Sequence, residues 1–242
     1  MKNWALRSNR LGLLVAAAAV AGGISVFWPG SSARAEDILQ EQGTLSPAQD
    51  EYTFSGTAGQ SVTITMTSAD FDTVLSLVGP DGQDVAFNDD YARSLNSTIV
   101  VTLPSTGSYK IVARSFSGNG GRYSVTVRPS TPYEQAYSTA WTAYSAGDFE
   151  AAIAGFEDAI AIDPNQPAVY LDRADARWGQ FYMNIGPEMN PDNPPQPSDE
   201  LKASIIADYE RAASLYEAAG DTDMAQGLRD QIEVLRTGNA PY

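Results

Sequence analysis

The stretch Arg128-Pro129-Ser130-Thr131-Pro132 divides the sequence into two halves with different periodicities. Two prolines within five residues interrupt both strands and helices. Before this stretch the sequence is rich in Thr, Val, Ser and Gly, and apolar residues alternate with polar ones. After it the sequence is rich in Ala, Glu and Asp, with helical spacing. We therefore predict a multidomain chain with an all-β domain over residues 36–129 and an all-α domain over residues 130–242.

Upstream of this joint, short alternating segments predict a series of β-strands. Tyr123, Val125 and Val127, for example, alternate with Ser124 and Thr126. Turn sequences rich in Gly, Pro, Asn and Ser separate the segments at intervals of about 8–12 residues, which is typical of an antiparallel β-sandwich. In such a sandwich each strand buries one face between two stacked sheets.

Seven motifs in this half occur in the order known from one bacterial family. They are Asp50–Phe54, Ala58–Ile64, Asp70–Leu75, Pro80–Gly82, Asn88–Asp90, Leu103–Pro104 and Gly107–Tyr109. From about residue 37 to residue 128 the sequence resembles the bacterial pre-peptidase C-terminal domain. The resemblance implies a jelly-roll-like antiparallel β-sandwich that accompanies secreted proteases and assists substrate binding, secretion or stability without being catalytic. Within these 242 residues no protease domain accompanies it.

Downstream of the joint, residues 133–164 have the spacing of a helical repeat. Small residues lie at Ala140, Ala152 and Ala159, where they allow two helices to approach closely. Gly147 permits a sharp turn between the helices, and Pro164 ends the second one. The unit resembles a tetratricopeptide repeat.

A second, interrupted repeat starts at Pro167. Prolines between residues 184 and 200 predict an inserted loop, after which a helical pattern resumes and a last helix covers residues 223–236. The resemblance implies about two and a half tetratricopeptide-like repeats. Roughly three repeats are needed for independent stability. We therefore expect contacts with the sandwich, with the terminal helix or with another subunit to stabilise the stack. A homo-oligomer is one of the open alternatives.

The repeat resemblance implies a concave surface that binds a protein or peptide partner. The candidate partner-binding residues are Tyr137, Trp141, Tyr144, Leu171, Asp175 and Trp178. The three aromatic residues of the first repeat share one helix face, and exposed aromatic residues anchor protein partners. The alternative is that they form the core of the helix pair or pack onto the sandwich. Glu134 and Asp175 would favour a neutral or basic peptide.

An acidic cluster in the β half is the candidate metal site. Five side chains with oxygen atoms occur within ten residues: Asp81, Asp84, Asn88, Asp89 and Asp90. Calcium takes about 6–8 oxygen ligands, and the family resemblance implies calcium binding in some relatives. The spacing is not that of an EF-hand loop. The alternative is turn chemistry, because Asp and Asn bond to their own backbone in turns. We therefore predict no cofactor, with calcium as the alternative.

Composition excludes most enzyme chemistry. The chain has no His and no Cys, so it offers no Ser-His pair, no thiolate nucleophile and no ordinary zinc or haem site. Its 30 Asp and Glu outnumber its 15 Lys and Arg, which gives a net charge of −15. A nucleic-acid partner is not expected, because phosphate binding needs clustered basic residues.

The first 35 residues have the layout of an export signal. Basic residues precede an apolar run over residues 11–28, and the triplet Ala33-Arg34-Ala35 fits cleavage after Ala35. The alternative is an uncleaved membrane anchor formed by residues 11–28. We predict an exported protein, periplasmic or extracellular, without stable membrane insertion once the signal is removed.

These observations together predict a non-enzymatic binding or scaffold protein. The helical repeats would bind a peptide or protein, and the sandwich would be an accessory domain. One alternative is a calcium- or glycan-binding adhesion module in which the sandwich is the active part. Another is an accessory subunit of a separately encoded secreted protease.

Overall fold

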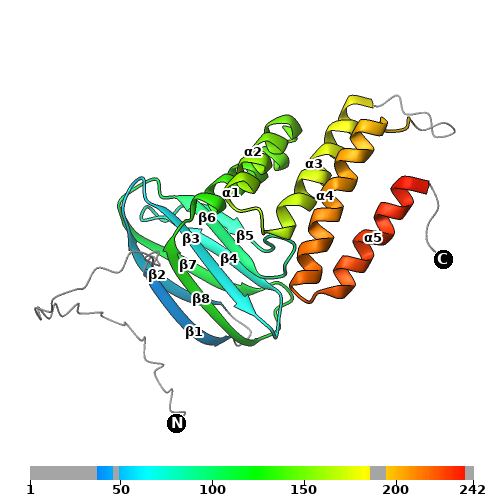
Figure 1. The fold of residues 1–242 in the computed structure, drawn as a ribbon. Coiled ribbons are helices and arrows are strands. Elements are labelled where there is room, and N and C mark those ends of the chain that lie inside the picture. The colour runs from blue at the N-terminus through cyan, green and yellow to red at the C-terminus, as the bar shows by residue number, and fades with distance from the viewer. Residues whose placement is uncertain (1–36, 46–48, 186–194, 238–242) are drawn as a thin grey trace, which may run out of the picture. The chain divides into compact units, whose positions relative to one another are not determined.

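The computed structural model describes residues 37–45, 49–185 and 195–237 as two antiparallel β-sheets followed by a run of helices (Figure 1). The predicted signal segment, residues 1–35, lies outside the described residues. From residue 35 onward the chain forms one compact unit. The described part contains no helix with the length and apolar character needed to cross a bilayer.

The two sheets have four strands each, and every pairing in them is antiparallel. The first sheet, in spatial order, consists of β1 (Leu39–Leu45), β8 (Gly121–Pro129), β3 (Ser61–Ser68) and β6 (Ser97–Thr102). The second consists of β2 (Asp50–Gly56), β7 (Gly107–Ser115), β4 (Thr73–Val78) and β5 (Asp84–Asn88). β6 and β5 are therefore edge strands, one in each sheet.

The core between the sheets follows the alternation seen in the sequence. In β3, Val62, Ile64 and Met66 are fully buried, and Ile64 pairs with Ile99 of β6 and Val127 of β8. The pattern places one face of each strand against the other sheet, which confirms the prediction of an antiparallel β-sandwich.

Five helices complete the described part of the chain. They are α1 (Pro132–Ser145), α2 (Phe149–Ile162), α3 (Pro167–Ile185), α4 (Asp199–Ala218) and α5 (Thr222–Thr237). Each helix packs against the next one along the chain. The expected boundary residues are in place: Gly147 and Gly220 adopt left-handed conformations with φ of 78° and 87°, which end α1 and α4.

The predicted insert over residues 184–200 falls between α3 and α4. α3 continues to Ile185, residues 195–198 are not helical, and Ser198 caps the N-terminus of α4 by accepting a hydrogen bond from the Leu201 amide. Residues 186–194 lie outside the described residues. The helix order is therefore as expected, whereas the tetratricopeptide nature of the helices stays a prediction.

The helices are joined to the sandwich at the start of α1. Thr131 and Glu134 form a capping box, in which the Thr131 hydroxyl accepts from the Glu134 amide and the Glu134 carboxylate accepts from the Thr131 amide. The same carboxylate accepts from Arg128 of β8 and from the hydroxyl of Thr63 in β3. These bonds fix the first helix to the end of the first sheet.

Candidate functional site

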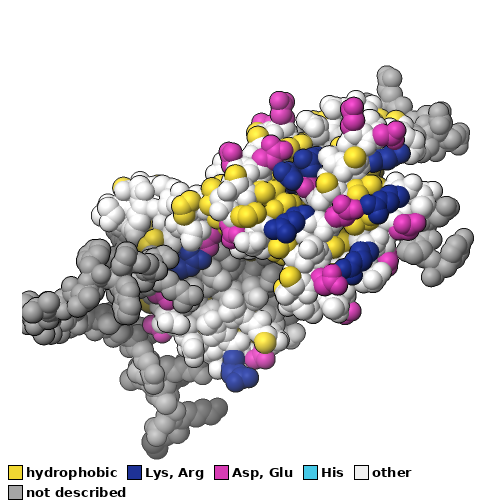
Figure 2. Space-filling model, viewed as in Figure 1, with side chains coloured by type: hydrophobic (Ala, Val, Ile, Leu, Met, Phe, Trp, Pro, Cys, Tyr) yellow, Lys and Arg dark blue, Asp and Glu magenta, His cyan; other side chains and the backbone are white. Residues whose placement is uncertain are grey.

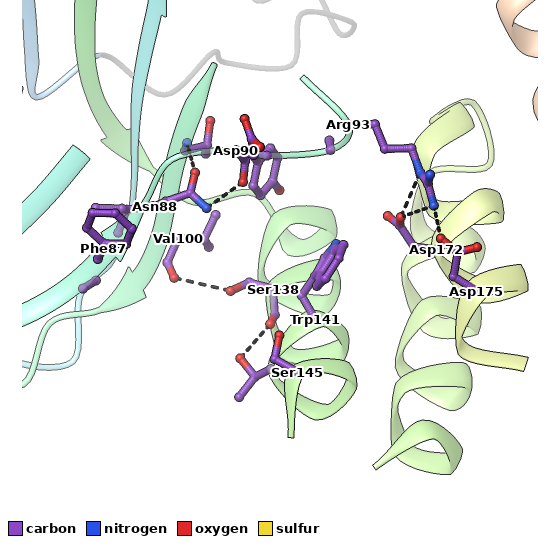
Figure 3. Close-up of a pocket in the computed structure, with 16 residues that line it drawn as sticks. Phe87, Asn88, Asp90, Arg93, Val100, Ser138, Trp141, Ser145, Asp172 and Asp175 are labelled. Carbon is purple, nitrogen blue, oxygen red and sulfur yellow. Dashed lines mark hydrogen bonds and ion pairs between the residues drawn. The ribbon is translucent and has the colours of Figure 1, made fainter. Parts of the chain in front are cut away.

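A cavity of about 660 Å³ lies where the sandwich meets the helices. Its walls come from β5, β6 and the loop between them, and from α1 and α3 (Figure 3). The cavity opens where the edges of the two sheets meet, and we call it the junction groove. The lining residues on which the following argument depends are Phe87, Arg93, Val100, Trp141, Asp172 and Asp175.

Aromatic side chains from both domains give the junction groove its apolar surface. Phe87 of β5 is 60 % exposed, which is unusual for a phenylalanine in a sandwich. Trp141 of α1 is half-buried and contacts Tyr144 and Phe156 edge to face, with centroid distances of 5.0 and 6.5 Å. Exposed aromatic surface beside a cavity is typical of a binding site.

One side of the junction groove is a row of hydroxyl groups on α1. Ser138, Thr142 and Ser145 lie at positions i, i+4 and i+7 and line the groove together. The Ser138 hydroxyl donates to the carbonyl oxygen of Val100 at 3.4 Å, and the Thr142 hydroxyl donates to the carbonyl of Ser138 at 2.9 Å. These hydroxyls contact backbone carbonyls, so this side of the groove is polar without being a nucleophile-base pair.

An ion-pair network forms the other end of the junction groove. Arg93, in the loop after β5, donates through Nε to Oδ1 of Asp172 at 3.1 Å and through Nη2 to Asp175 (Figure 3). Both aspartates belong to α3, so the pairs connect the sandwich to the helices. The Asp172 side chain is 2 % exposed, whereas that of Asp175 is 41 % exposed and faces the groove.

Tyr137 holds the buried carboxylate of Asp172 from the other side. Its hydroxyl donates to Oδ2 of Asp172 at 2.5 Å. Burial raises the pKa of Asp172, and this outweighs the opposing effects of the Tyr137 hydrogen bond and the Arg93 charge. Burial and the Asp172 charge raise the pKa of the Tyr137 hydroxyl above its ordinary value, which keeps it a donor.

The loop that carries Arg93 has an unusual backbone. Ala92 and Arg93 both have positive φ values, 50° and 61°, although neither is a glycine. This conformation is sterically unfavourable for residues with a Cβ atom. A pair of backbone hydrogen bonds between Tyr91 and Ser94 closes the loop, and the Tyr91 ring contacts Tyr137 edge to face at 5.3 Å. Contacts with the helices therefore stabilise a strained turn of the sandwich.

The structure places the predicted partner-binding residues in four different environments. Trp141 and Asp175 line the junction groove. Tyr144 is half-buried between Trp141 and Phe149. Trp178 lies at the other end of α3, in an aromatic cluster with Phe181 and Tyr182.

The expectation that Tyr137 and Leu171 face an open surface is wrong. Their side chains are 0 % and 3 % exposed, and both belong to the helical core. Tyr137 is covered by Phe156 on one side and by Tyr91 of the sandwich on the other. For Tyr137 the core alternative that the sequence left open therefore holds, and Leu171 is a core residue that the sequence analysis had placed on the surface.

The acidic cluster is arranged as turns in the structure. Asp81 accepts from the Gln83 amide, and Asp89 accepts from the Asp90 amide. The Asn88 side chain accepts from the Thr98 amide at 2.8 Å and donates to the carbonyl of Asp90 at 2.7 Å. Within the described ranges, no three residues among His, Cys, Asp and Glu come together as a metal site. Calcium binding by Asp81, Asp84, Asn88, Asp89 and Asp90 stays a prediction without structural support.

Sequence reasoning did not identify Phe87 and Arg93 as site residues. Phe87 fits the alternating pattern of a strand, which does not distinguish it from a core residue. Arg93 is separated from Asp172 by 79 residues, and a local pattern does not reveal such a pair. One local feature of the sequence pointed to Arg93: it is a basic residue that closely follows the acidic residues at the end of β5.

Comparison with known proteins identifies the class of the sandwich. Residues 49–115 match the family of the bacterial pre-peptidase C-terminal domain, which confirms that prediction for this part of the chain. Among curated proteins none matches the chain.

Several solved structures are similar to part of the chain. PliG of Aeromonas hydrophila, a periplasmic inhibitor of g-type lysozyme, is 20 % identical over 40 % of this chain and 88 % of its own, with a TM-score of 0.34. The pre-peptidase C-terminal domain of a collagenase from Bacillus anthracis is 15 % identical over 37 % of this chain and 88 % of its own, with a TM-score of 0.33. The Bacillus licheniformis lipase BlEst2 in propeptide form is 17 % identical over 48 % of this chain and 27 % of its own, with a TM-score of 0.31.

Proposed function

We propose that this chain is an exported, non-enzymatic protein-binding protein and that the junction groove takes up a segment of its partner. The observation that carries the proposal is that the exposed Phe87 of the sandwich and the half-buried Trp141 of α1 line the same cavity of about 660 Å³. Such a volume is in the range of ligand-binding clefts, and aromatic anchors contribute most of the binding energy at protein interfaces.

The position of the junction groove at two sheet edges supports an extended peptide as the occupant. Among the strands that the structure describes, β5 pairs only with β4, and β6 pairs only with β3. Edge strands present unpaired backbone groups to which an added peptide strand binds. The hydroxyl row of α1 faces these strands and offers polar contacts to a bound backbone.

Binding, not catalysis, is what the lining residues support. The chain has no His or Cys, and the carboxylates of Asp172 and Asp175 are paired with Arg93. The Ser138 hydroxyl is directed to the Val100 carbonyl. No general base is positioned beside a nucleophile among these groove residues, whereas catalysis without cofactors needs such a pair.

The helices act in this proposal as tetratricopeptide-like repeats that support one wall of the junction groove. Ala140, Ala152 and Ala159, the small residues of the repeat pattern, are all buried. Gly155 of α2 lies so close to α1 that an added Cβ atom would be 2.9 Å from the Cβ of Ala140. Close packing of successive helices through small residues is what the repeat resemblance implies.

Site-specific crosslinking in the native cell tests the proposal. A photo-crosslinking amino acid is placed at Thr142, which lines the junction groove, and as a control at Thr139, an exposed threonine of the same helix outside the groove lining. Both hydroxyls bond to the carbonyl four residues earlier, so the two sites are locally matched. We expect one protein to be captured at position 142 and not at position 139.

The captured protein is then purified and titrated with two variants. Thr142→Arg fills the junction groove and should abolish binding, whereas Thr139→Arg should leave binding unchanged. Equal binding by both variants would contradict the proposal. A secreted protease as the captured protein would support the accessory-subunit alternative, and an N-terminus after Ala35 in the native protein would support export.

A further inference from the structure

We propose that Asp172 and Asp175 form a receptor for the guanidinium group of an arginine in the partner segment. Arg93 of the sandwich occupies this receptor within the same chain, and the partner's arginine replaces it. The inference rests on the proposed binding function of the junction groove and names the kind of segment that the groove recognises: an arginine next to an apolar residue.

The two aspartates are arranged to recognise a guanidinium group. Oδ1 of Asp172 accepts a hydrogen bond from Nε of Arg93 at 3.1 Å and also lies 3.1 Å from Nη2, which donates to Asp175. The second oxygen of Asp172 is held by Tyr137, which belongs to the helical core. The receptor is therefore positioned by α1 and α3, and a planar group with several donors fits it better than a lysine ammonium does.

Arg93 is an occupant that comes from outside the helical domain. It belongs to the loop between β5 and β6, and its side chain is 34 % exposed. The positive φ values of Ala92 and Arg93 make the bound form of this loop unfavourable by itself. Its release relaxes the backbone of the loop and leaves the hydrogen bond between Tyr137 of α1 and Asp172 of α3 in place.

The charge around the receptor favours a cationic segment. Asp90, Asp172 and Asp175 line the junction groove together with a single basic residue, Arg93. Elsewhere on the helices basic side chains are interspersed with acidic ones, as Figure 2 shows, and Arg229 and Arg236 pair with Glu217 and Glu210. The chain as a whole has a net charge of −15, which attracts a basic partner.

The neighbouring apolar surface defines the rest of the segment. Trp141 points toward the receptor side of α1, and Phe87 lies on the sandwich side of the groove (Figure 3). A segment whose arginine reaches Asp175 therefore places its adjacent residues along this apolar wall. Burial of an apolar side chain there adds affinity to the charge recognition.

Removal of Arg93 should leave a folded protein with an open receptor. Without Arg93, Oδ2 of Asp172 keeps the hydrogen bond from the Tyr137 hydroxyl, and the partly exposed Asp175 stays accessible to water. Arg93→Ala therefore leaves Asp172 with a hydrogen-bond partner and is a suitable variant for the test.

The test uses short capped peptides that contain one tryptophan followed by one arginine, lysine, citrulline or glutamate. Binding to the full chain is measured by calorimetry. We expect the arginine peptide to bind Arg93→Ala at least about tenfold more tightly than the unaltered chain, because the competing occupant is gone. Citrulline keeps the shape without the charge, so its peptide should show no such gain, and Arg93→Ala/Asp175→Asn should lose it.

A second measurement does not depend on peptide design. Ethylguanidinium at millimolar concentration should raise the melting temperature of Arg93→Ala, whereas ethylammonium should not, and neither should stabilise the unaltered chain. Arg93→Gln serves in the same experiments if Arg93→Ala proves poorly folded.

The inference is overturned if the arginine peptide binds Arg93→Ala no more tightly than the unaltered chain, or if neither protein binds it. It is also overturned if the citrulline peptide gains equally. The proposed function fails separately, when Thr142→Arg leaves binding of the captured partner intact. A partner that needs Thr142 but is indifferent to Arg93 and Asp175 would preserve the proposed function and reject the arginine receptor.

Discussion

Arg128 at the end of β8 and Glu134 in the first turn of α1 form a bidentate ion pair across the joint between sandwich and helices. The Glu134 side chain is only 12 % exposed and accepts in addition from Thr63 and from the Thr131 amide. One carboxylate therefore caps a helix and connects it to the neighbouring sheet. This arrangement explains why the joint is defined although Pro129 and Pro132 interrupt regular structure there.

Glu134→Gln should destabilise the chain by about 2 kcal/mol in chemical denaturation. The amide keeps the size of the side chain and one oxygen that can accept from the Thr131 amide, but it loses the ion pair with Arg128 and turns an NH2 group toward the guanidinium. Hydrogen bonds to charged groups contribute about 1.5–3 kcal/mol. The control is Glu150→Gln, an exposed residue in the first turn of α2, for which we expect a change below about 0.5 kcal/mol. Equal effects of the two substitutions would show that Glu134 acts through the helix dipole alone.

Asp208 and Glu157 make a matched pair for a second prediction, because both contact Arg173 and Arg177. The Asp208 side chain is 2 % exposed and accepts from both arginines, whereas that of Glu157 is 54 % exposed and lies 3.7 Å from each. Asp208→Ala leaves two half-buried cations facing each other and should cost about 3–5 kcal/mol. Glu157→Ala should cost less than about 1 kcal/mol.

Thermal unfolding followed by circular dichroism measures both variants. The helical signal of Asp208→Ala should melt at a clearly lower temperature, because α3 and α4 lose the pairs that connect them. If Glu157→Ala lowers the melting temperature as much as Asp208→Ala does, burial does not determine how much these ion pairs contribute to stability.

The helix order was predictable because its signals are local. Gly147 and Pro164 mark the ends of α1 and α2, and the structure ends these helices at Ser145 and Ile162. Each signal depends on the backbone of a few consecutive residues: a left-handed glycine or a proline without an amide hydrogen. The alternation within the strands is local in the same way, which is why the sandwich was predictable too.

The junction groove was not predictable because it depends on contacts between distant segments. Tyr137, Trp141 and Tyr144 share a helix face, yet the first is fully buried and the other two are half-buried. The Tyr91 ring, more than forty residues earlier in the chain, covers Tyr137. The periodicity of a helix defines a face but does not show which part of that face another domain covers. The pairing of Arg93 with α3 was not predictable for the same reason, because it too joins segments that are distant in the sequence.

The carboxyl groups of Asp172, which is buried, and of Glu134, which caps α1, should have opposite effects on the pH dependence of stability. Burial raises the pKa of Asp172, so the folded state binds a proton more tightly than the unfolded state does, and this contribution to stability is lost as the pH rises from about 4 through the raised pKa. Although burial opposes it, the hydrogen bond from Arg128 and the other contacts lower the pKa of Glu134. Its contribution is lost as the pH falls below about 4.

Denaturation across the pH range should therefore show two distinct differences from the unaltered chain. Asp172→Asn should reduce the decline of stability above about pH 4, whereas Glu134→Gln should reduce the decline below it. Variants that change the pH profile in the same direction would contradict this assignment of the two carboxyl groups.

Two helical glycines separate intrinsic helix propensity from helix packing. At Gly155 an added Cβ atom would lie 2.9 Å from the Cβ and 3.1 Å from the Cα of Ala140, so α1 and α2 would have to move apart. At Gly227 in α5 nothing lies within 4 Å of the added atom.

Gly227→Ala should stabilise the chain by about 0.5–1 kcal/mol, because alanine favours the helix. Gly155→Ala has the same intrinsic gain but should destabilise the chain by about 1–3 kcal/mol through overpacking. Chemical denaturation of both variants decides the matter: a stabilising Gly155→Ala would mean that α1 and α2 are not in the close contact that the repeat pattern predicts.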